Sequence, residues 1–155
     1  MNYDAIVIGA GPAGSSLALH LARQGRRCAL IDGATFPRTK VCGEGIMPHG
    51  IAALRRLGIE PQGAAFGGLR YVLSDGTQAE GRFPDSLTGL GVERIWLDAE
   101  LVKRTEAEPR IDVRLGTWVR RVDLPTDPRE RVAVHLGGEV LTCEVLIGAD
   151  GGRSR

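Results

Sequence analysis

The stretch that decides the fold lies near the start of the chain: Asp4-Ala5-Ile6-Val7-Ile8-Gly9-Ala10-Gly11-Pro12-Ala13-Gly14. Its first half, from Ala5 to Ile8, is a short apolar run of the kind expected for a strand covered on both faces. The glycines then follow the spacing G-x-G-x-x-G: Gly9 permits a tight turn, Gly11 lets the backbone approach a pyrophosphate, and Gly14 lets a helix pack closely on the strand. Pro12 suits the first turn of that helix, where its missing N–H costs nothing.

The helix predicted after these glycines has Leu17 and Leu21 on one face and ends near Gly25. Its N-terminus offers free N–H groups and the positive end of the helix dipole to an anion. A second strand-like run, Cys28 to Asp32, follows, and Asp32 stands 18 residues after Gly14, where its carboxylate can accept a hydrogen bond from a ribose hydroxyl. An acidic residue there disfavours a 2′-phosphate, so NADP is the least expected occupant. The pattern predicts a dinucleotide-binding turn and leaves the identity of the dinucleotide open.

Composition limits the classes of function. The chain has 155 residues, of which 43% are hydrophobic and 25% charged, with a net charge of +1, as in ordinary soluble globular domains. Arginine pairs are scattered along the sequence rather than gathered, so we expect no nucleic-acid binding. There is no run of about 18 apolar residues to span a membrane. Cys28 and Cys143 lie in strand-like runs and Cys42 in a loop; with no paired framework among them, a reducing cytoplasm is the simplest location.

The middle of the chain predicts a loop, two helices and a hairpin. Residues 33–50 are rich in glycine and proline, and an irregular loop of this length inside a compact domain is usually functional. Pro48 to Leu57 predicts a short helix, and Trp96 to Ala107 a longer one that Pro109 stops. Between them, Leu69 to Leu73 and Gln78 to Phe83 predict two strands, joined by a turn at Asp75-Gly76.

The last third of the chain predicts more strands. Ile111 to Leu115 and Val145 to Ala149 are apolar runs that we expect to pair in parallel with the two strands of the glycine-turn region. Between them lie three further strand-like runs, 118–124, 131–136 and 139–143, which predict an antiparallel meander. The fold class is therefore α/β: a Rossmann-like parallel sheet with a βαβ dinucleotide-binding turn and an antiparallel β-meander crossover.

Two further motifs carry a resemblance to a family. They are Glu93-Arg94-Ile95-Trp96-Leu97-Asp98, at the predicted start of a helix, and Gly148-Ala149-Asp150-Gly151-Gly152-Arg153-Ser154, after the last strand. Together with the glycine turn and the meander, in this order, they resemble the flavoprotein monooxygenase superfamily over essentially the whole chain. The resemblance implies that FAD is the cofactor, that Arg94 reaches its phosphate and ribityl region, that Asp150 and Gly151 meet the ribityl chain near the pyrophosphate, and that the backbone of Val119 meets the adenine.

Each of these residues also has an ordinary structural interpretation. Arg94 could be a surface arginine paired with Glu93 or Asp98, although a guanidinium is also a planar donor suited to phosphate. Asp150 could simply end a strand in an Asp-Gly turn. The residues expected to bind the cofactor are, in chain order, Gly9, Gly11, Pro12, Ala13, Gly14, Asp32, Cys42, Gly43, Gly45, Arg94, Val119, Asp150 and Gly151.

The loop Pro37-Arg38-Thr39-Lys40-Val41-Cys42-Gly43-Glu44-Gly45 narrows the resemblance. Cys-Gly-Glu-Gly after such a loop is similar to geranylgeranyl reductases and related oxidoreductases more than to typical aromatic hydroxylases. In those relatives the segment lies beside the flavin, which implies that Cys42, Gly43 and Gly45 contact the cofactor. Cys42 could equally be a small buried residue. We find no Ser-His-Asp arrangement and no metal-ligand cluster, and no catalytic residue can be named.

The resemblance also implies what a complete enzyme would contain. The chain ends at Arg155, before a further family arginine and a substrate-binding region, so we expect the N-terminal part of a longer protein. We expect one FAD-binding domain over 1–155: a core of 1–32, 92–116 and 144–155, an excursion at 33–91, and the meander at 117–143. NAD(P)H would reduce FAD, which would then support hydroxylation or double-bond reduction of an apolar or aromatic small molecule. The isolated 155 residues would be inactive.

Two alternatives stay open at this point. The chain could be an NAD-dependent dehydrogenase domain, since the glycine turn alone does not choose between dinucleotides. It could also be a nucleotide-binding fragment without catalysis. Fold analogy cannot choose between hydroxylation and reduction.

Overall fold

The computed structural model describes residues 1–127 and 129–152. The chain forms two compact units, one made of residues 1–38 with 98–155 and the other of residues 39–97. Each unit is described by itself.

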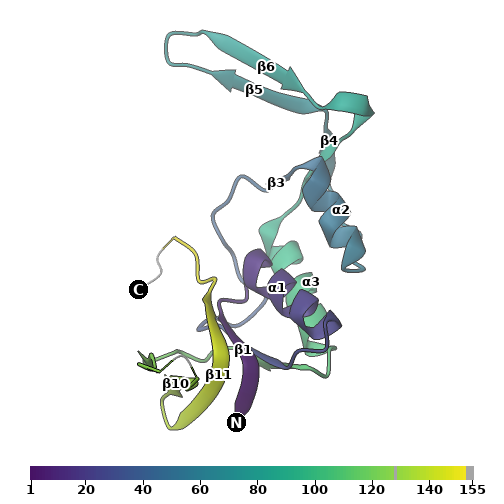
Figure 1. Cartoon of the computed structure of the whole chain (residues 1–155). Helices are drawn as coiled ribbons and strands as arrows, with labels where there is room; N and C mark the ends of the chain where they lie inside the picture. The colour runs from purple at the N-terminus through teal and green to yellow at the C-terminus, as the bar shows by residue number, and fades with distance from the viewer. Residues whose placement is uncertain (128, 153–155) are drawn as a thin grey trace. The chain divides into compact units, whose positions relative to one another are not determined.

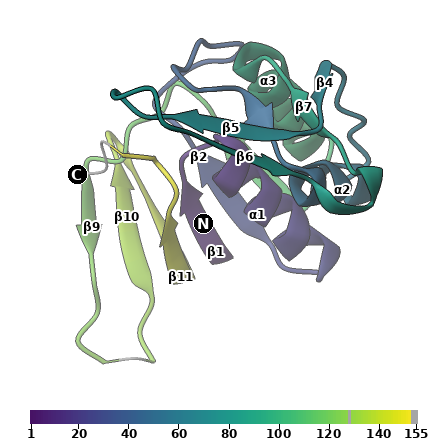
Figure 2. The same ribbon diagram turned by 90° about the horizontal axis from the view of Figure 1, so that it is seen from above.

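The first unit is built on a six-stranded sheet whose centre is parallel and whose edge is an antiparallel meander (Figure 2). β1 is hydrogen-bonded in parallel to β2 on one side and β11 on the other, and β2 is parallel to β8. β10 is antiparallel to both β11 and β9. The predicted fold class is therefore confirmed. In sheet order the strands are β8 (Ile111–Arg114), β2 (Cys28–Ile31), β1 (Asn2–Ile8), β11 (Glu139–Gly148), β10 (Val132–Leu136) and β9 (Arg121–Asp123).

Helix α1 (Pro12–Arg23) covers one face of this sheet, and the side it buries is not the one that carries Leu17 and Leu21. Its buried residues are mostly small and include Ala18 and Ala22, whereas Leu17 and Leu21 are only partly buried. The thiol of Cys28 lies 3.8 Å from the carbonyl oxygen of Ala18, which shows how closely the helix approaches β2. Small side chains fit this close contact.

A hydrophobic cluster fills the opposite face of the sheet. Val7 lies against Gly14 of α1, and neighbouring residues in a strand point to opposite faces, so Ile6 points away from the helix. Ile31 belongs to the same cluster as Ile6. Val134 and Leu141, from the meander, complete its centre and are fully buried. Both faces of the central strands are thus covered, as their continuous apolar runs predicted.

One strand of the first unit is longer than predicted. Residues 139–143 and 145–149 were expected as two strands, but β11 is continuous from Glu139 to Gly148 and lies beside β1 (Figure 1). The charged residue between the two runs, Glu144, is exposed and pairs with Arg131 at 2.8 Å. The charge breaks the apolar pattern without breaking the strand.

The second unit contains helix α2 (Pro48–Arg56) and a small three-stranded sheet that the sequence did not reveal. In α2, Ile51 and Leu54 are buried. The sheet has the order β3 (Gly45–Ile46), β7 (Gly89–Gly91) and β4 (Ala64–Phe66), all antiparallel. Strands of two or three residues carry too little alternation to predict, so residues 45–46 were assigned to the loop. Helix α3 (Arg94–Glu106), whose residues from Asp98 on belong to the first unit, begins two residues earlier than predicted, and Arg104 pairs with Glu100 in it at 3.2 Å.

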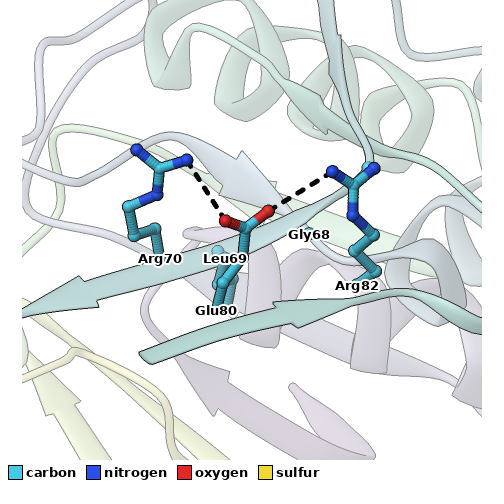
Figure 3. Close-up of a pocket in the computed structure, with 6 residues that line it drawn as sticks. Gly68, Leu69, Arg70, Glu80 and Arg82 are labelled. Atoms are coloured by element: carbon cyan, nitrogen blue, oxygen red, sulfur yellow. Dashed lines mark hydrogen bonds and ion pairs between the residues drawn. The ribbon is translucent and has the colours of Figure 1, made fainter. Parts of the chain in front are cut away.

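The predicted hairpin is present as a separate two-stranded sheet of β5 (Gly68–Val72) and β6 (Gln78–Arg82), followed by the short 3-10 helix η1 (Pro84–Ser86). On one face Glu80 lies between Arg70, at 3.1 Å, and Arg82, at 3.5 Å, beside a shallow hollow (Figure 3). The other face is apolar and exposed, with Tyr71 opposite Ala79. The ion pairs are solvent-exposed, and surface pairs of this kind contribute little to stability.

Candidate functional site

The glycine turn joins β1, α1 and the end of β11. Gly9 adopts φ +109°, and a Cβ there would lie 2.4 Å from the carbonyl oxygen of Ala149. A Cβ at Gly14 would lie 1.8 Å from the carbonyl oxygen of Gly9, so the helix rests directly on the turn. The turn and packing roles predicted for Gly9 and Gly14 are confirmed, since neither position has room for a side chain.

Gly11 differs from the other two glycines because the space beside it is open. The nearest atom to a Cβ at this position would be Nη2 of Arg38, at 3.7 Å. Gly11 is the N-cap of α1, Pro12 occupies the first turn, and Ala13 is exposed. Within the described part of the chain, no side chain caps this helix start and no acidic residue lies in its first turn. The backbone N–H groups and the dipole are thus available to an anion in the open space.

Asp32, directly after β2, is fixed by the backbone on both of its oxygens. Oδ2 accepts a hydrogen bond from the N–H of Ala10 and Oδ1 one from the N–H of Ala34, each at 2.8 Å. Its side chain is 15% exposed. Each carboxylate oxygen can accept a second hydrogen bond, so a ribose hydroxyl remains a possible partner for Asp32. The carboxylate also ties the glycine turn to the end of β2, a structural role that the sequence did not predict.

Arg38 is a site residue that the sequence analysis missed. Its Nη2 lies 3.6 Å from the fully buried carboxylate of Asp98 and 3.9 Å from Asp32. The guanidinium stacks on the ring of Phe36, with 4.7 Å between its central carbon and the ring centroid. Its buried Nε has no hydrogen-bond partner among the described residues. The sequence does show an arginine directly after Pro37, in the loop that follows Asp32. Only the packing shows that the charge of this arginine faces Gly11.

The segments after β8 and β11 contain three more of the predicted residues. Asp150 is exposed just after β11, and its backbone nitrogen would be 2.7 Å from a Cβ at Gly9; Gly151 follows with φ +86°. Val119 lies after β8, in a segment whose Thr117 N–H donates to the carbonyl of Asp32 at 3.0 Å. The structure thus gathers the glycine turn, Asp32, Val119, Asp150 and Gly151 at the carboxyl ends of the parallel strands, where α/β sheets bind ligands.

The remaining predicted residues belong to the second unit. Cys42 is exposed, which contradicts its interpretation as a small buried residue. A hydrogen bond from the Glu44 backbone, followed by one from the Arg94 side chain, lowers the pKa of its thiol. The N–H of Arg94 donates to Oε1 of Glu44 at 3.3 Å. A Cβ at Gly43 would meet no atom within 4 Å, whereas Gly45 starts β3 beside Phe66. Cys42, Glu44 and Arg94 therefore form one local group.

Two kinds of site are not found among the residues that the structure describes. No group of three or more histidine, cysteine, aspartate or glutamate side chains could hold a metal ion. None of the helices has the length and apolarity needed to cross a bilayer.

Comparison with known proteins decides which dinucleotide the site takes. Residues 2–155 match the family model described as an FAD binding domain. The chain belongs to this family. Its site fits the cofactor: the space at Gly11, the uncapped helix start and the unpartnered Nε of Arg38 suit a pyrophosphate. FAD is thus the cofactor of this domain, and the alternative of an NAD-dependent dehydrogenase domain is not favoured.

Two relatives of this FAD-binding domain are named as reductases. It is 38% identical to a menaquinone reductase of Mycolicibacterium smegmatis, over 97% of this chain and 38% of the relative. It is 32% identical to a geranylgeranyl diphosphate reductase of Rhodobacter capsulatus, over 100% of this chain and 39% of the relative. The chain thus spans about two fifths of the length of these curated relatives.

Solved structures agree on the fold. The myxobacterial chondrochloren halogenase, an FAD-dependent halogenase, superposes with a TM-score of 0.82 at 25% identity, over 99% of this chain and 38% of that one. The p-nitrophenol 4-monooxygenase of Pseudomonas putida superposes with a TM-score of 0.79 at 20% identity, over 99% of this chain and 42% of that one. The resemblance to flavoprotein monooxygenases and geranylgeranyl reductases predicted from the sequence is confirmed.

Proposed function

We propose that this domain holds the adenosine and pyrophosphate of FAD in a flavin-dependent reductase that acts on an apolar, isoprenoid-type molecule. The single observation that carries the choice of reduction over hydroxylation is that two relatives above 30% identity along the whole domain are both named reductases. The monooxygenase with a solved structure is only 20% identical. The Cys-Gly-Glu-Gly loop supports the same choice by its resemblance to geranylgeranyl reductases.

In this proposal the residues of the first unit bind and orient the cofactor. The open space at Gly11 receives the pyrophosphate, where the N–H groups of α1 and the guanidinium of Arg38 face it. Asp32 accepts a hydrogen bond from a ribose hydroxyl while its backbone partners hold the carboxylate in place. Asp150 contacts the chain that leads to the flavin. FAD supplies the redox chemistry, and these residues only position it.

The remaining assignments extend the proposal to the whole protein. Cys42, Gly43, Gly45 and Arg94 are proposed to contact the flavin, NAD(P)H to reduce it, and a downstream region of the same protein to bind the substrate. The free state of all three cysteines supports a reducing, cytoplasmic location. The extent of the domain predicted from the sequence, with its core, excursion and meander, stays a prediction.

The test is a product analysis with the complete protein that contains this domain. Under anaerobic conditions with NADPH or NADH, we expect FAD to be reduced and a menaquinone or geranylgeranyl substrate to lose one double bond per nicotinamide oxidised. An oxygenated product formed only in air, with no anaerobic turnover, would show that the protein is a monooxygenase instead.

A further inference from the structure

Trp118 occupies an unusual position beside the proposed adenosine site. It lies in the segment after β8, which is hydrogen-bonded to the segment after β2: the N–H of Thr117 donates to the carbonyl of Asp32, and the N–H of Gly116 to that of Ala34, both at 3.0 Å. These bonds place Trp118 against Gly33. A Cβ at Gly33 would be 2.4–2.6 Å from three carbon atoms of the indole, so the ring lies directly on the glycine backbone.

The burial of Trp118 does not explain this arrangement. Its side chain is 64% exposed, although tryptophan is a large apolar residue that usually gains its stability from burial. The neighbouring Val119 packs against the hydrophobic cluster of the sheet, whereas Trp118 is not among the residues that do so. The indole therefore contributes little to the core, and Gly33, on which it lies, is the residue next to Asp32 in the chain.

We propose that the indole of Trp118 forms one wall of the adenine subsite and stacks on the adenine ring of FAD. This inference rests on the proposed binding of the ribose by Asp32. The base is attached to the same ribose, so a ribose held by Asp32 brings the base within reach of Gly33 and the ring that covers it. Aromatic stacking favours a flat purine and needs no hydrogen-bonding group, which suits an exposed tryptophan. Gly33 is required because any side chain there would displace the ring.

The chain offers a direct optical test, since it has two tryptophans. Trp96→Phe leaves Trp118 as the only indole, and this single-tryptophan protein is titrated with ADP while its fluorescence is followed. We expect saturable quenching, weaker with UDP, whose smaller base stacks less well. Calorimetry should show that Trp96→Phe retains the ADP affinity of the parent, whereas Trp118→Ala weakens it about tenfold and Trp118→Phe by less.

Further variants distinguish the failure of this inference from the failure of the proposed site. Gly33→Ala, which displaces the indole, should weaken ADP as Trp118→Ala does. If Asp32→Ala weakens ADP but Trp118→Ala does not, and the indole is not quenched, the adenine lies elsewhere and the inference is wrong while the site stands. If neither variant changes ADP affinity, the proposed ribose site fails and the inference with it. A Trp118→Ala protein that loses ADP and UDP affinity equally would have lost only structure, which also overturns stacking.

Discussion

Gly11 and Gly14 provide a test in which two substitutions of the same kind should have opposite effects. Gly11 has an extended backbone, with φ −70° and ψ −178°, and open space where a Cβ would lie. A residue other than glycine can adopt this conformation, so Gly11→Ala should change the free energy of unfolding by no more than about 1 kcal/mol. A methyl group there occupies the space proposed for the pyrophosphate.

The expected loss of affinity follows from the contacts that the methyl group prevents. A hydrogen bond to a charged group contributes about 1.5–3 kcal/mol, so one lost N–H contact to phosphate weakens binding by roughly 10- to 150-fold. Gly11→Val, with more bulk, should abolish FAD retention in the complete protein while the chain remains folded. Calorimetric titration with FAD and urea denaturation measure the two quantities separately.

Gly14→Ala is the matched control. Its Cβ would lie 1.8 Å from the carbonyl oxygen of Gly9, so the helix must move away from the turn. Overpacking of this kind costs about 1–3 kcal/mol or more in the free energy of unfolding. Normal FAD binding by Gly11→Ala and Gly11→Val, or a Gly14→Ala protein as stable as the parent, would contradict these roles of the two glycines.

Three further predictions concern stability, reactivity and solubility. Burial would raise the pKa of Asp112, but hydrogen bonds from Arg114 and Tyr3 outweigh the effect of burial and lower the pKa. These bonds to the charged carboxylate stabilise the folded state. The stabilisation is present above the pKa of the unfolded chain, ~3.9, and is lost as the pH falls through the lower pKa of the folded chain. Asp112→Asn should therefore be less stable than the parent at pH 7 in urea denaturation, by a margin that narrows in acid; an equal margin at both pH values contradicts this. Cys42 is exposed and its thiol pKa is lowered, so it should react with iodoacetamide well before Cys28, because burial raises the pKa of Cys28 to about 11. Mass spectrometry identifies which cysteine peptide is labelled first, and labelling of Cys28 first would contradict the prediction. Leu69 and Tyr71 form an exposed apolar face on the hairpin, and such faces promote aggregation. The double variant L69T/Y71T should therefore scatter less light than the parent at high protein concentration. Unchanged scattering would show that the hairpin is not the aggregating surface.

The nucleotide turn could be predicted because each of its requirements is written locally in the sequence. Gly9 and Gly14 have no room for a side chain. Asp32 directly follows β2, 18 residues after Gly14 in the sequence, and its carboxylate accepts a hydrogen bond from the N–H of Ala10 in the turn. The hairpin turn is equally local: Gly76 adopts φ +85°, and Oδ1 of Asp75 accepts a hydrogen bond from the N–H of Thr77 at 2.8 Å. Short-range steric and hydrogen-bonding rules suffice for such elements.

The missed features depend on contacts between distant segments. The charge of Arg38 is placed by Asp98, sixty residues later in the chain, and by the ring of Phe36. The buried face of α1 could not be found from Leu17 and Leu21, because the distance between helix and sheet, rather than hydrophobicity, selects small residues such as Ala18 there. The strands β3, β4 and β7 exist only through their pairing with one another. None of these is visible in the periodicity of a single segment.

We expect this chain alone to carry the adenosine–pyrophosphate half of the FAD site. Titration calorimetry of the 155-residue chain with ADP, FAD and FMN measures this. We expect ADP and FAD to bind weakly, with similar affinities and in competition with one another, and FMN, which lacks the adenosine, not to bind. Binding of FMN as strong as that of FAD, or no binding of ADP, would contradict the assignment of the glycine turn and Asp32 to this half of the cofactor.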